Sequence, residues 1–184
     1  MLNYKEDRLF TNWELNNQIT VPAAYYAMNT HNASFFYDDS KSFSTEISSN
    51  YGDFYGGTIF SFAPTANYIF NRYFRCSINY RYNQVNFPAS YSNNGNATYK
   101  SNLVALKCNV TLSSKFSINL LGQYDDVSNS FGSNLRLRYN PKEGTDLYIV
   151  YNSIINTNRL EAIPNLPLLE QQAILIKYSV TFNL

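Results

Sequence analysis

The feature that most constrains this chain is an alternation of apolar and polar side chains with a period of two, which recurs roughly nine times along it. The C-terminus shows the alternation most clearly. Its apolar face consists of alternate residues up to the final one: Ile174, Ile176, Tyr178, Val180, Phe182 and Leu184. Because successive side chains of a β-strand point to opposite faces, the pattern predicts strands with one apolar and one polar face. We therefore expect an all-β chain of about 9–10 antiparallel strands.

The same alternation marks further strands upstream. They are expected near residues 43–51, 74–82, 104–112, 117–124, 131–139 and 147–151. Two other segments are less regular. Pro64 interrupts the apolar stripe of residues 60–70, and proline lacks the N–H that a central strand donates. Between Tyr25 and Tyr37 both faces carry aromatic residues, so the inner and outer faces of that strand stay unassigned.

Short and longer connections alternate between the expected strands. Short turns are predicted at 38–41, 71–73, 113–115 and 140–145, where turn-forming residues cluster. Longer connections are predicted at 7–24, 52–57, 88–97, 125–129 and 156–171. Since consecutive antiparallel strands reverse direction, this order places every longer connection at the same end of the sheet.

The composition excludes several classes of protein. Charged residues make up 15% of the chain and aromatic residues 17%, while 26 asparagines and 19 serines supply much of its polarity. Disordered chains are poor in aromatic residues and rich in charge, and helix bundles are rich in alanine, glutamate, lysine and leucine, so both classes are excluded. A net charge of +1 gives no support to nucleic-acid binding. No apolar run reaches the ~18 residues of a transmembrane helix. Charges at residues 5–8 exclude a signal peptide there, so we expect either a cytoplasmic protein or the tail of a longer exported chain.

The expected strands favour a membrane environment. They span about 10–14 residues, whereas strands of soluble proteins average about 5–6 and a tilted strand crosses a bilayer in ~9–11. Aromatic strand ends, low charge and alternating connections are also typical of barrels whose apolar residues face lipid and whose polar residues face the lumen. We predict that residues 1–184 form one domain, an up-and-down transmembrane β-barrel or the C-terminal part of one, in the bacterial outer membrane. A soluble all-β binding module, for instance for carbohydrate, is the alternative.

The C-terminal stripe resembles the barrel-assembly signal of Gram-negative outer-membrane proteins. Outer-membrane lipid and the barrel-assembly machinery are therefore expected partners. The alternative interpretation of the stripe is the last strand of a β-sandwich, with Phe182 in its core.

Several segments carry a resemblance to a family. Residues 136–152, which end in Asp-Leu-Tyr-Ile-Val-Tyr-Asn, and residues 175–184 resemble the C-terminal barrel of outer-membrane proteins whose N-terminal domain is similar to carbohydrate-binding modules of family 9. Residues 21–25 and 51–57 are similar to other parts of that barrel, a domain of unknown function. The resemblance implies that residues 1–184 are the last strands of a larger, porin-like barrel, and that residues 1–5 are the remnant of one strand. Upstream strands and the carbohydrate-binding-like domain would then be partners within the same protein.

Few residues indicate chemistry. His31 is the only histidine, and without a nucleophile and base in reach of each other we interpret it as a polar or rim residue. Asp53, Asp125 and Asp126 fall in longer connections, where they could hold calcium but are expected to be solvated. We expect no enzyme activity, no cofactor and no metal site.

The two cysteines and a group of aromatic residues have structural interpretations. Cys76 and Cys108 lie far apart on apolar faces and form neither a metal-ligand spacing nor a disulfide framework, so each is interpreted as a small apolar side chain. Loop or rim aromatics could stack on sugar rings, although membrane-interface or loop packing is the favoured interpretation. They are Trp13, Phe54, Tyr55, Tyr91 and Tyr99.

The polar faces hold the residues of most interest for function. Six of them are basic, against Glu46 alone: Arg75, Arg81, Lys107, Arg136, Arg138 and Lys177. In a barrel lumen such a wall favours anions, unless acids of upstream strands or a plug neutralise it. The predicted role is a pore or transporter, or an anchor for a surface domain.

Overall fold

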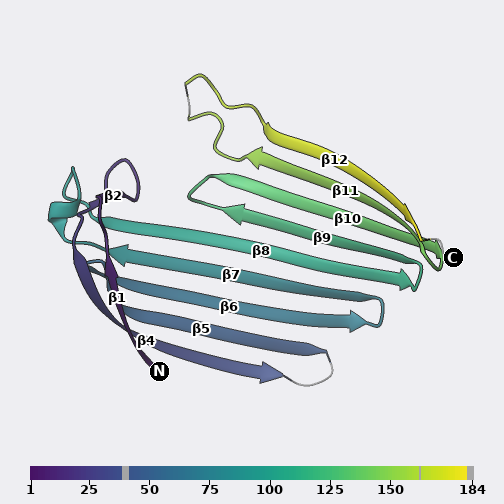
Figure 1. Cartoon of the computed structure of the whole chain (residues 1–184), viewed down its shortest axis with the longest axis horizontal. Helices are drawn as coiled ribbons and strands as arrows, with labels where there is room; N and C mark the ends of the chain where they lie inside the picture. The colour runs from purple at the N-terminus through teal and green to yellow at the C-terminus, as the bar shows by residue number, and fades with distance from the viewer. Residues whose placement is uncertain (39–41, 162, 182–184) are drawn as a thin grey trace. The chain divides into compact units, whose positions relative to one another are not determined.

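The computed structural model describes residues 1–38, 42–161 and 163–181, and most of them lie in β-strands. The main sheet has ten strands, each hydrogen-bonded to the next one along the chain (Figure 1). They are β1 (Leu2–Arg8), β4 (Tyr25–Asp38), β5 (Phe43–Phe54), β6 (Gly57–Asn71), β7 (Phe74–Asn86), β8 (Thr98–Ser113), β9 (Phe116–Asp125), β10 (Ser130–Lys142), β11 (Thr145–Asn156) and β12 (Leu169–Val180). This order confirms the expected all-β, antiparallel, up-and-down arrangement, and β1 and β12 stand at its two ends.

Strand lengths agree with the sequence pattern. From β4 to β12 the main strands have 10 to 16 residues. The strand expected over residues 60–70 is confirmed, and β6 continues through Pro64 although this residue interrupts the apolar stripe. Within the described part of the chain, no helix has the length and apolarity to cross a membrane.

One connection is much tighter than expected. Residues 52–57 were predicted to be a longer loop, yet only Tyr55 and Gly56 separate β5 from β6. Both have positive φ, 45° and 81°, as the central residues of a type I′ hairpin do. The long connections are 9–24, 87–97 and 157–168, and the predicted turn at 38–41 includes residues 39–41, which lie outside the described part.

The chain divides into two compact units. Unit 1 comprises residues 1–36, 46–64 and 81–102, and unit 2 comprises residues 37–45, 65–80 and 103–184. The strands β4 to β8 contribute residues to both units.

Unit 1 has a small apolar core over a segment that the sequence pattern leaves as a loop. Residues 9–24 include a second, two-stranded sheet of β2 (Trp13–Glu14) and β3 (Thr20–Val21). Ile19 and Val21 from this segment are 1% and 0% exposed, the lowest values in the core. They contact Tyr26 and Met28 of β4, and Phe87 and its neighbours complete the cluster.

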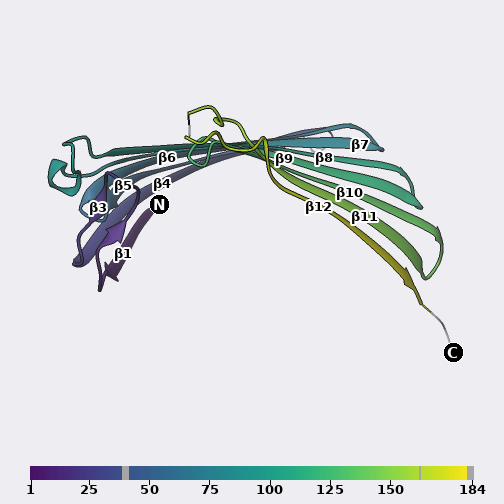
Figure 2. The same ribbon diagram turned by 90° about the horizontal axis from the view of Figure 1, so that it is seen from above.

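Unit 2 contains β9 to β12 and residues 103–113 of β8, and these strand segments pair in a continuous register. Figure 2 shows β9 to β12 following one another in chain order. One row of paired residues runs Cys108, Leu120, Leu135, Tyr151 and Ile174 across the five strands. Because directly paired residues lie on the same side of a sheet, this row defines what we call the apolar face of unit 2.

The opposite side of the same strands is the polar face of unit 2. One of its rows runs Lys107, Leu121, Asn134, Asn152 and Ala173. The next rows contain Arg136 paired with Asn119, and Arg138 paired with Ser117. The alternation read from the sequence is therefore kept in register over five strands.

Candidate functional site

The apolar face of unit 2 has exposed side chains on β8, β9, β10 and β12, while those of β11 are partly buried. Ile174, Ile176 and Tyr178 of β12 are 64%, 69% and 66% exposed. Further exposed apolar side chains on this face come from β8 to β10: Val104, Leu106, Leu120, Tyr124, Phe131, Leu135 and Tyr139. Soluble monomers rarely leave so extended an apolar surface uncovered. Of the expected assembly signal, Phe182 and Leu184 lie outside the described residues, whereas Val180 ends β12 on this face.

The polar face of unit 2 carries four of the six basic residues selected from the sequence. The pairing partners of Lys107, Arg136 and Arg138 on β9 are Leu121, Asn119 and Ser117, which alternate along one side of that strand. Lys177 joins them because it and Arg138 both pair with Tyr148.

The two remaining basic residues lie on β7. Arg75 shares a cavity with Lys107. Arg81 is an exposed residue of unit 1, six positions further along the strand.

Arg138 is neutralised by a residue that the sequence reasoning missed. Its Nε donates a hydrogen bond of 2.9 Å to Oδ1 of Asp146, and Asn140 donates a second one of 3.1 Å to the same oxygen. The guanidinium also lies 5.9 Å from the ring centroid of Tyr148. Glu46 is therefore not the only acid of the polar faces, and the earlier count was wrong because Asp146 follows a turn by one residue and reads as part of it.

Arg75 and Lys107 lie together in unit 2. They line a cavity of about 310 Å³ whose other polar linings include Asn67, Ser77 and Asn109. Among the described residues no carboxylate lines this cavity, so its charge is positive. Such a site attracts anions.

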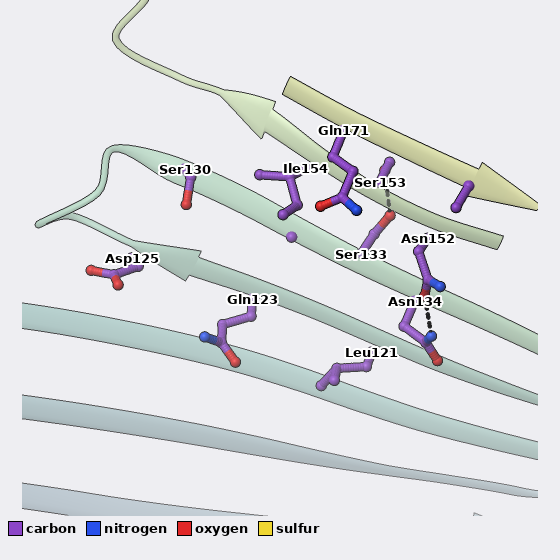
Figure 3. Close-up of a pocket in the computed structure, with 12 residues that line it drawn as sticks. Leu121, Gln123, Asp125, Ser130, Ser133, Asn134, Asn152, Ser153, Ile154 and Gln171 are labelled. Carbon is purple, nitrogen blue, oxygen red and sulfur yellow. Dashed lines mark hydrogen bonds between the residues drawn. The ribbon is translucent and has the colours of Figure 1, made fainter. Parts of the chain in front are cut away.

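A cavity on the polar face of unit 2 is uncharged over most of its lining. It has a volume of about 470 Å³ and spans β9 to β12 (Figure 3). Asn134 and Asn152 join across β10 and β11 by a hydrogen bond on this face, whereas the 2.8 Å hydrogen bond between the Ser133 and Ser153 hydroxyls lies on the opposite, apolar face. Gln123, Ser130 and Gln171 add amide and hydroxyl groups. The rest of the lining is mixed, because it includes the carboxylate of Asp125 and apolar residues such as Leu121 and Ile154.

The two cysteines form a disulfide, which corrects the expectation of two separate apolar side chains. Cys76 of β7 and Cys108 of β8 are 32 positions apart in the sequence, with Cα atoms 4.2 Å apart. Directly opposite residues in antiparallel strands come about this close where they do not exchange backbone hydrogen bonds. The pairing could not be read from the sequence because it depends on the register of β7 against β8.

The aromatic candidates gather in unit 1. Trp13 contacts Phe54 and Tyr55, with ring centroids 6.4 and 5.7 Å apart. Tyr91 lies against Phe87 at 5.9 Å, and Tyr99 packs on the same core. Trp13, Phe54 and Tyr55 also line one cavity, together with Asn50 and other residues.

The remaining candidates are not brought together. His31 is exposed on β4 and pairs with Leu2 of β1. Asp53 accepts a hydrogen bond of 3.1 Å from the backbone N–H of Asn29, and Asp125 accepts one of 2.9 Å from that of Val127. Over the described residues no group of three or more histidine, cysteine or acidic side chains could hold a metal ion.

Comparison with protein-family models, with curated proteins and with solved structures gives no match.

Proposed function

We propose that this chain is a transmembrane β-barrel segment of the bacterial outer membrane, with a pore or transport role. The observation that carries the proposal is the pair of opposite faces in unit 2, one apolar and exposed, the other polar and basic. A soluble sheet buries its apolar face, whereas a membrane barrel turns it towards lipid. We take the acyl chains of the bilayer to be the partner of the apolar face.

Strand length supports the same proposal. The shortest main strand from β4 to β12, β9, has 10 residues, and a tilted strand needs about 9–11 to cross a bilayer. Most strands of soluble proteins are shorter by about half.

The disulfide supports an extracytoplasmic location. Disulfides persist in the periplasm and on cell surfaces, while cytosolic thiols are kept reduced. The Cys76–Cys108 bond is therefore in keeping with a chain that folds outside the cytoplasm. We also include in this proposal the resemblance of the sequence to the barrel domains of outer-membrane proteins that carry a carbohydrate-binding-like domain.

The polar face indicates which solutes would be favoured. Lys107, Arg136 and Lys177 are exposed on it, while Arg138 has the carboxylate of Asp146 as a partner. A lumen lined this way has a net positive wall, which would favour small anions over cations.

Two adjacent substitutions test which face meets lipid. Ile176→Arg places a charge on the apolar face, and Leu175→Arg places the same charge on the polar face; both wild-type side chains are more than half exposed. If the apolar face meets lipid, Ile176→Arg should destabilise the protein by about 2–4 kcal/mol near the bilayer midplane, because lipid does not solvate the guanidinium. Leu175→Arg should change stability little.

The measurement is a urea titration of refolding into phosphatidylcholine vesicles, followed by heat-dependent gel mobility. Equal effects of the two substitutions would contradict the proposal. So would a wild-type protein that stays folded and monomeric in buffer without detergent or lipid, which is the behaviour of a soluble module.

A further inference from the structure

A cavity in unit 1 combines aromatic and polar walls. Its volume is about 310 Å³, at the lower end of the range for small-molecule sites. Trp13, Phe54 and Tyr55 supply the aromatic part, and Lys5, Asn50 and Asp53 supply charged and amide groups. These residues come from β1, from the segment between β1 and β4, and from the β5–β6 hairpin.

The aromatic wall is built around Trp13. Its indole meets Phe54 and Tyr55 at interplanar angles of 66° and 68°, so these contacts are edge contacts between the rings. Trp13 remains 37% exposed, which leaves part of the indole accessible. The faces of aromatic rings carry negative potential and attract the weakly positive C–H groups of a ligand.

Tyr55 occupies a turn position that rarely carries a large side chain, and contacts with other residues hold it there. Its φ of 45° lies in the left-handed region, where hairpins favour asparagine, aspartate or glycine. Its hydroxyl donates a hydrogen bond of 2.6 Å to Asp7, and its ring packs against Tyr26 at 5.3 Å. A strained residue kept in position by several contacts is typical of functional sites.

The polar wall offers a hydrogen-bond acceptor. Oδ1 of Asn50 is buried and has no hydrogen-bond partner among the described residues. Lys5 lies 3.4 Å from the carboxylate of Asp7, and Asp53 accepts the backbone N–H of Asn29. Both charged groups thus have protein partners, while a buried acceptor without one is costly and calls for a donor.

We propose that this cavity binds a neutral saccharide. A sugar ring has an apolar C–H face for Trp13 and hydroxyl groups for the polar wall. Because Oδ1 of Asn50 is sealed from solvent, a ligand hydroxyl reaches it only when the Asn50 side chain turns towards the cavity. A cationic or anionic ligand would have to compete with the existing partners of Lys5 and Asp53. The inference rests on unit 1 alone and does not depend on whether unit 2 lies in a membrane.

The tryptophan provides a local probe, because Trp13 is the only one in the chain. The full chain, kept in a detergent without a sugar headgroup, is titrated with glucose, N-acetylglucosamine and maltotriose while its tryptophan emission is recorded. Arginine and benzoate serve as charged controls. We expect a saturable change with at least one saccharide and none with the charged compounds.

Substitution of Asn50 tests the polar wall. Asn50→Leu should weaken the saccharide titration about tenfold or more, as expected when a buried hydrogen bond is lost. Asn50→Asp keeps an acceptor oxygen and should retain binding. Asn134→Leu is the matched control, because Asn134 lines a cavity of unit 2 and should leave the titration unchanged.

Wild-type measurements keep the test decisive if the Asn50 variants fail to fold. A bound saccharide should then also raise the melting temperature of the wild-type protein. The proposal is overturned if no saccharide gives a saturable response, if only arginine or benzoate responds, or if a folded Asn50→Leu variant titrates like the wild type.

Discussion

At the scale of single residues, two polar pairs join different elements of the chain. Arg138 and Asp146 come from β10 and β11, and Tyr55 reaches from the β5–β6 turn to Asp7 in β1. The ion pair offsets the positive charge that the sequence alone would assign to Arg138. The hydrogen bond to Asp7 uses the hydroxyl donor of Tyr55. The consequence is that a residue's type and face do not by themselves give its electrostatic contribution.

Tyr55 gives a prediction for the dependence of stability on pH. Its hydrogen bond to the Asp7 carboxylate, together with partial burial, raises the pKa of the Tyr55 phenol above its ordinary value of 10.0. The neutral phenol is thus favoured in the folded state, so this contribution is complete below about pH 10 and is lost as the pH rises through the raised pKa.

The corresponding substitution is Tyr55→Phe, which removes the hydroxyl and keeps the ring. At pH 7 we expect it to lower the free energy of unfolding by roughly 1 kcal/mol, since the bond to a carboxylate is partly screened by solvent. Urea denaturation at pH 7, 9 and 11 should show the two proteins converging at the highest pH. Tyr73→Phe, in the β6–β7 connection, is the control, and a difference that grows with pH would contradict the assignment.

At the scale of elements, the alternation of side chains accounts for the strands but not for their pairing. Leu135, for example, is assigned to an apolar face by its neighbours in sequence, and the register places it between Leu120 and Tyr151. The period of two is a local property of extended backbone, so the sequence displays it. Register depends on contacts between distant residues, and a shift by one residue would exchange the two faces.

The disulfide gives a prediction at this scale. It joins β7 to β8 and closes a chain segment with a sequence separation of 32, so its removal should cost about 3–4 kcal/mol in the loop-entropy description. The variant carries Cys76→Ser and Cys108→Ser, and the measurement is urea denaturation with and without reductant. The wild type should lose stability on reduction, while the double variant should be insensitive to it. Free thiols that react with maleimide in the unreduced, exported protein would contradict the bond.

At the scale of the whole molecule, the two end strands of the main sheet constrain the proposed membrane state. β1 and β12 end the strand order, and a strand edge in lipid leaves backbone groups without partners at several kcal/mol each. In the proposed membrane state these edges must pair with each other or with further strands. Barrels of single bacterial chains have even numbers of strands, and the main sheet has ten.

The charge of the polar face gives the prediction for the assembled molecule. In planar bilayers with a salt gradient, the protein purified from membranes should show a reversal potential that favours anions. Arg136→Ser should reduce this preference more than Arg138→Ser, because Arg138 already has the carboxylate of Asp146 as a partner. A cation preference, or the absence of conductance, would indicate neutralised bases or a plug and would favour an anchoring role.

The sequence by itself determined the all-β class, the approximate strand positions and the separation into apolar and polar faces, because each depends on the local period of side chains. Only the tertiary structure decided four features that depend on register or on long-range packing. Cys76 meets Cys108, and Asp146 neutralises Arg138. Residues 9–24 bury Ile19 and Val21, and Trp13 comes to line one cavity with Asn50. Arg138 and Asp146 are close in sequence, on either side of one turn, whereas the other contacts depend on residues that are far apart in the chain. Composition and the period of two carry no signal for any of these contacts.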